Sequence, residues 1–190
     1  MLFDLRTYTI RRKIFKVFGA AFHVYDMDGR VVGYSSQKAF KLREDIRVYS
    51  GEDMSEELLT LQARQIIDWS AAYDIVDART GEKVGAARRK GWSSMVRDAW
   101  ELLDEEDRPI GHAQEDSMAM ALVRRFLSNL VPQTFHLRSE DGRDQALLRV
   151  HFNPFVYRQT VVIEETCRID PRLVFGAAVL LAAIEGRQQS

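Results

Sequence analysis

The chain has 190 residues, of which 46% are hydrophobic and 29% charged, and its formal net charge is -1 at neutral pH. These values are typical of a globular protein with a substantial core and exclude a wholly disordered chain. The near-zero net charge argues against nucleic acid as the main partner. One cysteine, Cys167, excludes an intrachain disulfide framework and fits a reducing, cytoplasmic compartment.

No Pro-, Gly- or Ser-rich linker divides the chain, so we expect a single domain over residues 1–190. Charged residues interrupt residues 1–12, which therefore lack the apolar stretch of a secretory signal. The longest apolar run, Leu173–Ile184, has twelve residues, whereas a helix that spans a bilayer needs about 20. We expect no transmembrane span.

The first predicted elements are a strand over Ile14–Phe18 and a hairpin over His23–Gly33. The hairpin combines an aromatic-led alternating strand, an Asp-Gly turn and a closing aliphatic-Gly pair. An Asp-Gly pair favours the positive φ of a primed two-residue turn. Strands are next expected over Ala39–Val48 and Leu58–Ile67. The segment from Val48 to Leu59 is a degenerate copy of the hairpin.

Two further copies of the hairpin follow, over Tyr73–Gly85 and Trp100–Gly111. An amphipathic helix is expected over Ser117–Leu130, because its apolar residues share one face and Pro132 follows its end. The last predicted strands bring the total to about ten to twelve, and they are Thr134–Arg138, Ala146–Phe152 and Val156–Thr166.

A terminal helix is expected over residues 170–186, with Asp170 as its N-cap and Pro171 at its first position. Its central run has no polar face, so protein or lipid must surround it. At 1.5 Å per residue, the twelve-residue run is about 18 Å long, a rod that a many-stranded antiparallel sheet can enclose. The predicted fold is therefore mainly β: an antiparallel barrel of about twelve strands around a hydrophobic C-terminal helix.

The order of these elements resembles the tubby C-terminal-like superfamily, which includes tubby, the phospholipid scramblases and the LURP-one-related proteins. The hairpins that begin Tyr25-Asp26-Met27-Asp28-Gly29 and Tyr73-Asp74-Ile75-Val76-Asp77 carry the resemblance. So do Val84 to Lys90, Trp100-Glu101-Leu102 with Ile110-Gly111, and the terminal Asp170-Pro171-Arg172-Leu173-Val174. The similarity covers roughly residues 10 to 186. It implies a twelve-stranded barrel that encloses the last helix.

For function, the resemblance implies the binding of phosphoinositide headgroups, as in tubby, or an association with lipid movement, as in the scramblase-like members. Tubby holds the headgroup with a Lys-x-Arg pair just after an aliphatic-Gly pair. Here Val84-Gly85 is followed by Ala86-Ala87-Arg88, so Arg88 matches the arginine while Ala86 stands in place of the lysine. We therefore expect poor selectivity among phosphoinositides.

The candidate ligand-binding residues are Arg88, Arg89, Lys90 and Trp92. Clustered cations attract anionic phosphates, and a tryptophan suits the membrane interface. The alternative is a strand end with solvated charges and one packed tryptophan. Other basic residues extend this patch if they fold nearby, and otherwise form solvated strand faces; they are Arg11, Arg12, Lys13, Lys38, Lys41 and Arg43.

No catalytic, metal-binding or cofactor-binding pattern is apparent, so we expect a non-enzymatic protein without a cofactor or metal. Asp26 and Asp28 lack the rest of a calcium loop, and the acidic run 104–107 is expected to form an exposed turn. Two hypotheses remain. The first is a module that binds anionic phospholipid headgroups at the membrane surface, and the second is a soluble protein-interaction or regulatory scaffold.

Overall fold

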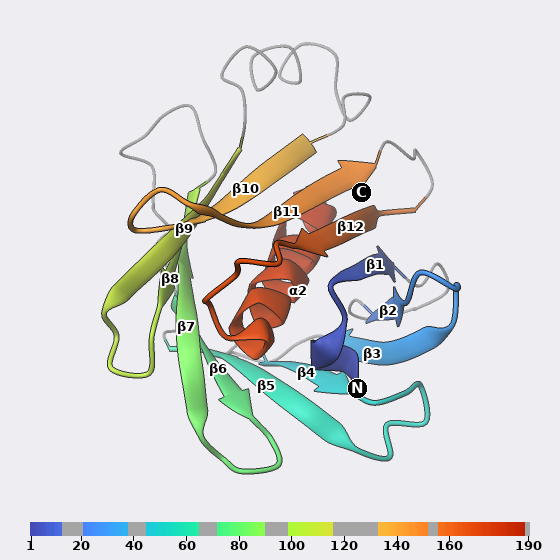
Figure 1. The fold of residues 1–190 in the computed structure, drawn as a ribbon. Helices are drawn as coiled ribbons and strands as arrows, with labels where there is room; N and C mark the ends of the chain where they lie inside the picture. The colour runs from blue at the N-terminus through green and yellow to red at the C-terminus, as the bar shows by residue number, and fades with distance from the viewer. Residues whose placement is uncertain are drawn as a thin grey trace.

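The computed structural model describes residues 1–12, 21–37, 45–64, 72–89, 99–115, 133–151 and 156–188. Twelve antiparallel strands form a closed barrel in which each strand pairs with its neighbours in sequence. The first strand, β1, pairs with the last, β12, and closes the barrel. The predicted barrel of about twelve strands is thus confirmed (Figure 1). The predicted strand Ile14–Phe18 and the predicted helix Ser117–Leu130 lie outside the described residues.

The strands are short, five to eight residues each, and alternate between a buried and a more exposed side chain. Their bounds are β1 Thr7–Arg12, β2 Ala21–Tyr25, β3 Val31–Gln37, β4 Asp45–Tyr49, β5 Glu57–Ala63, β6 Ala72–Asp77, β7 Lys83–Arg89, β8 Ala99–Leu103, β9 Pro109–Glu115, β10 Gln133–Ser139, β11 Asp144–His151 and β12 Arg158–Ile163. A short 3-10 helix, η1 (Leu2–Asp4), precedes β1. The Thr-Tyr-Thr-Ile alternation of β1 is a strand pattern that was not among the predicted elements.

The predicted hairpins are β2–β3, β6–β7 and β8–β9, and the degenerate copy between Val48 and Leu59 is the hairpin β4–β5. The expectation of primed two-residue turns is wrong. In the first hairpin the amide of Asp26 donates to the carbonyl of Arg30, only Gly29 has positive φ, and the register shifts at Val24/Tyr25. A longer turn with a bulge follows the twist of the strands and needs only one residue with left-handed backbone angles. That residue is Gly29, so Asp28 keeps ordinary backbone angles.

The C-terminal helix, α2 (Pro171–Gln188), runs through the barrel (Figure 1). Every residue from Leu173 to Ala183 is buried, which confirms the predicted core helix. The Asp170 carboxylate accepts from the Arg172 amide at 2.8 Å, as expected of the N-cap. Gly176 is required for packing, because a Cβ there would lie 2.8 Å from Ile75 Cδ1. None of the described helices combines the length and apolarity needed to cross a bilayer.

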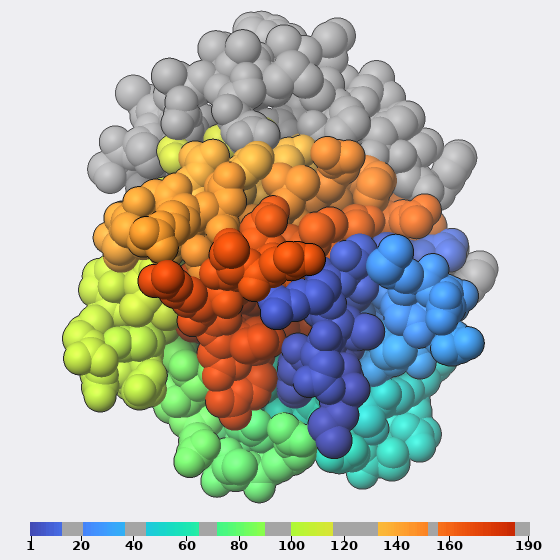
Figure 2. Space-filling model, in the orientation of Figure 1, coloured from blue at the N-terminus to red at the C-terminus, as the bar shows by residue number. Residues whose placement is uncertain are grey.

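Because the strands alternate in direction, the five hairpin turns lie at one end of the barrel, together with the segment 164–170 that leads into α2. We call this the hairpin end. The odd-numbered strands from β1 to β11 finish at the opposite end, where the even-numbered strands begin. On the face shown in Figure 2, the first residues of the chain (deep blue) lie against the last part of the barrel (orange-red), as the β1–β12 pairing requires.

An ion cluster ties the start of α2 to the barrel wall. Arg172 donates to Asp77 Oδ2 at 2.9 Å, and Asp77, whose side chain is 1% exposed, also pairs with Arg79. Burial alone would raise the pKa of Asp77, but hydrogen bonds from Arg79 and Arg172 outweigh it and lower the pKa to about 2. The ionised carboxylate therefore stabilises the folded state.

Acid should remove this contribution. The pKa of Asp77 is lower in the folded state than its ordinary value of 3.8, so the stabilisation is present above about pH 4 and is lost as the pH falls through about 2. The difference corresponds to about 2 kcal/mol at most. In urea unfolding, the free energy of unfolding of the parent should exceed that of Asp77→Asn, and this difference should shrink by that amount between pH 5.5 and pH 2. A difference independent of pH would contradict this assignment.

Candidate functional site

The predicted site begins at the last residues of β7, at the opposite end of the barrel from the hairpin turns. Arg88 and Arg89 are described, whereas Lys90 and Trp92 lie outside the described residues. Arg88 is 45% exposed and points along the outer face of the sheet toward the neighbouring strand β8. Arg89 is half-buried and makes contacts of its own.

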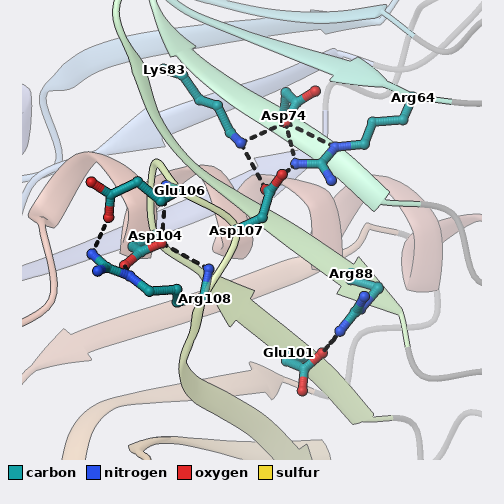
Figure 3. Close-up of polar contacts among 9 residues, drawn as sticks. All are labelled: Arg64, Asp74, Lys83, Arg88, Glu101, Asp104, Glu106, Asp107 and Arg108. Carbon is teal, nitrogen blue, oxygen red and sulfur yellow. Dashed lines mark hydrogen bonds and ion pairs between the residues drawn. The ribbon is translucent and has the colours of Figure 1, made fainter.

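Arg88 is not a solvated charge. It lies directly opposite Glu101 in the β7–β8 register, and its guanidinium donates from Nε to Glu101 Oε2 at 3.0 Å and from a second nitrogen to the same oxygen (Figure 3). The Glu101 side chain is only 10% exposed. The alternative of a solvated strand-end charge is therefore wrong for Arg88. A headgroup that used this arginine would have to share it with Glu101.

Other described charges on this side of the barrel are also paired. Arg64 at the end of β5 donates to Asp74 at 3.0 Å and to Asp107, and Lys83 donates to Asp107 at 2.7 Å (Figure 3). These four groups come from β5, β6, β7 and the β8–β9 turn, and their charges cancel. The acidic turn 104–108 binds its own Arg108 through Asp104. It forms an exposed turn, as predicted.

The hairpin end of the barrel is strongly acidic. The hairpin turns and segment 164–170 contain fifteen Asp or Glu and five Lys or Arg, a net charge of -10. The stretches of sequence between β1 and β12 that lie outside the described residues contain nine Lys or Arg and four Asp or Glu, a net charge of +5. Of the basic segments singled out in the sequence, the structure describes Arg11 and Arg12 on β1 and Arg88 and Arg89 on β7, which lie at the end opposite the hairpin turns, whereas residues 13, 38–43 and 90 lie outside the described residues.

A second group of cations lies on the barrel wall, and of its members only Arg11 was singled out from the sequence. Arg11, Arg149, His151 and Arg158 lie near the opposite end, on β1, β11 and β12. The register places Arg158 directly opposite both Arg11 and His151, and Arg149 opposite Thr160. The alternation of Arg149 and His151 along one strand could have indicated from the sequence that both lie on one face. Their proximity to Arg11 could not have been predicted in this way, because β1 and β12 become neighbours only when the barrel closes.

A cleft of about 730 Å³ lies at the hairpin end, beside the start of α2. Its apolar floor includes Ile169 and Leu173, and its rim carries both signs of charge. The backbone amides in the first turn of α2 donate to Asp170, and Lys83 and Arg172 are held in ion pairs. The described residues therefore offer no concentrated positive charge in this cleft.

The described residues contain no group of three or more His, Cys, Asp or Glu that could hold a metal ion. Cys167 donates to the carbonyl of Ile169, and burial raises the pKa of its thiol above the ordinary value. A raised pKa disfavours the reactive thiolate.

Comparisons with protein-family models, with curated proteins and with solved structures found no match. The resemblance to the tubby-like superfamily therefore stays a prediction.

Proposed function

We propose that this protein is a non-enzymatic module that binds anionic phospholipid headgroups, with the end of the barrel away from the hairpin turns facing the membrane. The observation that supports this function is the net charge of -10 at the hairpin end, together with the basic composition of the sequence stretches that lie outside the described residues. An anionic surface attracts basic segments with about 1 kcal/mol per cation and repels the acidic hairpin end, so the field both attracts and orients the barrel. On this proposal the protein is cytoplasmic and attaches peripherally to the membrane.

The pairing of Arg88 with Glu101 lowers the net positive charge that this site offers to a headgroup. Glu101 neutralises Arg88 at the strand end, so a headgroup must compete with a nearby carboxylate. Arg89, Lys90 and Trp92 would supply the remaining contacts. Binding should then depend mainly on the charge density of the lipid surface. The chain lacks the Lys-x-Arg pair, and Arg88 is already bound to Glu101, so neither feature is present to select one headgroup.

The first test is co-sedimentation with vesicles of phosphatidylcholine, with and without phosphatidylglycerol, at low and moderate salt. We expect binding only to the anionic vesicles, and weaker binding as salt rises. The variant R88Q/R89Q/K90Q should lose about two orders of magnitude in partitioning, since three charges contribute about 1 kcal/mol each and 1.4 kcal/mol is tenfold. No binding of the parent protein to anionic vesicles would refute the proposal and favour the protein-interaction scaffold.

A second variant tests whether Arg88 itself faces the lipid. Glu101→Gln removes the carboxylate that neutralises Arg88 and should raise partitioning about fivefold, the equivalent of about 1 kcal/mol. The matched control is Glu105→Gln, which makes the same change of charge on an exposed residue at the hairpin end. Equal effects of the two variants would show that only net charge matters and that Arg88 lies away from the lipid.

A further inference from the structure

The cations on the β1–β12–β11 wall form a row across three strands. His151, Arg158 and Arg11 occupy directly opposite positions in consecutive strands, and Arg149 lies two residues before His151 on the same face of β11. Side chains directly opposite in an antiparallel pair have Cβ atoms about 5 Å apart, so their charged ends can lie close together. All three arginines are exposed.

This row differs from the paired charges elsewhere on the wall. In the described part of the chain, the guanidinium groups of Arg11, Arg149 and Arg158 make no ion pair and no side-chain hydrogen bond. By contrast, Arg47, Arg64 and Arg88 each bind a carboxylate on their own or a neighbouring strand. Like charges placed directly opposite each other destabilise a sheet, so an Arg11–Arg158 pair without a counter-ion is an arrangement that local stability does not favour.

Hydroxyl groups lie beside the cations. His151 Nε2 is 2.8 Å from Thr160 Oγ1, which is 3.3 Å from Thr9 Oγ1 on β1. Thr9 and Thr160 form the next row of the sheet, beside Arg149. Three guanidinium groups, an imidazole and two hydroxyls therefore present a set of donors on one face. The nearest described carboxylate is Glu52, which is bound to His23, the residue opposite Arg11 on β2.

We propose that Arg11, Arg149, Arg158 and His151 form a binding site for a phosphate group. Arginine suits this ligand because its planar fork donates two parallel hydrogen bonds to phosphate oxygens. A bound phosphate would supply the counter-charge that the row lacks. The proposal goes beyond the proposed function, because it names a specific site on the wall that does not depend on Arg88 or on membrane attachment. The phosphate can belong to a lipid headgroup or to a soluble phosphate ester.

The charge state of His151 supports this assignment. Burial, together with Arg158 and Arg149, holds its pKa below the ordinary value, so the free protein carries mostly neutral imidazole at neutral pH. The described groups that face it are Arg149 on its own strand and Arg158 and Thr160 on β12; the nearest described residues of β10, Gln133 and Thr134, lie opposite Val150 and Arg149 and do not titrate. A bound anion favours the protonated ring, so the binding of a phosphodiester, whose own charge does not change near neutral pH, should strengthen as the pH falls toward 6.

The experiment uses two probes. One is vesicles of phosphatidylcholine and phosphatidylglycerol, whose phosphodiester does not titrate near neutral pH. The other is inorganic phosphate, followed by amide and imidazole NMR shifts. The test variant R11Q/R158Q should bind both probes at least tenfold more weakly than the parent. The control R30Q/R143Q removes the same charge from exposed arginines at the hairpin end and should change binding less than twofold. His151→Gln should remove the increase in vesicle binding at lower pH.

The outcomes separate the two proposals. Phosphate shifts at residues 11, 149, 151 and 158 without vesicle binding would support this site as one for a soluble phosphate ester and refute the membrane function. Vesicle binding that R11Q/R158Q and R30Q/R143Q reduce equally would leave the membrane function and overturn the site. Unfolding of the variant is not expected, because removal of like charges should leave its Tm at or above that of the parent; circular dichroism checks this point.

Discussion

Leu180→Asp should prevent the barrel from folding. Leu180 is fully buried in the middle of α2, where the inward side chains of the barrel surround the helix. An unpaired carboxylate there would lose at least about 4 kcal/mol relative to leucine, a large share of the total stability of an ordinary domain. The variant should accumulate in the insoluble fraction, and any soluble protein should lack a cooperative thermal transition by circular dichroism.

The control for this change is Leu180→Met, which keeps the volume and should cost less than about 1.5 kcal/mol. A folded, cooperative Leu180→Asp variant that has lost only membrane attachment would mean that α2 is an anchor and not the core of the barrel. Burial of every side chain from Leu173 to Ala183 is the reason we expect the opposite.

Gly85→Ala should destabilise the protein by about 3 kcal/mol, because it combines backbone strain with overpacking. Gly85 has φ of +155°, and a Cβ at this position would lie 2.4 Å from the carbonyl oxygen of Leu103 and 3.0 Å from the Leu173 side chain. Neither neighbour can move away easily, since one is the backbone of β8 and the other belongs to the buried first turns of α2. Urea unfolding monitored by fluorescence measures the loss.

Gly81→Ala, in the turn of the same hairpin, is the matched control. Gly81 has φ of +75°, but no atom lies within 4 Å of a Cβ built there. It should therefore show only the cost of a left-handed backbone, about 1 kcal/mol. Equal losses in the two variants would show that β7 can move away from β8 and α2, and that close packing at Gly85 contributes nothing.

The closing glycines of the hairpins now have a physical explanation. The aliphatic-Gly pairs at 33, 85 and 111 recur in the sequence, and each glycine lies where another segment packs closely against the strand. A Cβ at Gly111 would lie 2.5 Å from the carbonyl oxygen of Arg138 and 3.3 Å from Ile169, and one at Gly33 would meet Leu2. The sequence revealed the repeat, but the partners became visible only in the folded barrel.

The sequence by itself determined the buried core helix and the approximate number of strands, about ten to twelve. A run without a polar face has to be enclosed, and the repeated strand-turn-strand pattern supplied enough sheet to enclose it. Both conclusions follow from local composition and periodicity, which each segment carries in its own residues. The Asp170 N-cap was predictable for the same reason, because the cap and the amide it binds are two residues apart.

Only the tertiary structure decided how the charges are grouped. Arg88 appeared to be a free cation until the β7–β8 register placed Glu101 opposite it. Arg172 binds Asp77 from 95 residues away. Arg11 and Arg158 meet because the first and last strands close the barrel. Whether a charge is neutralised depends on neighbours across strands, and strand register is set by turns, bulges and closure acting together, which no single segment specifies.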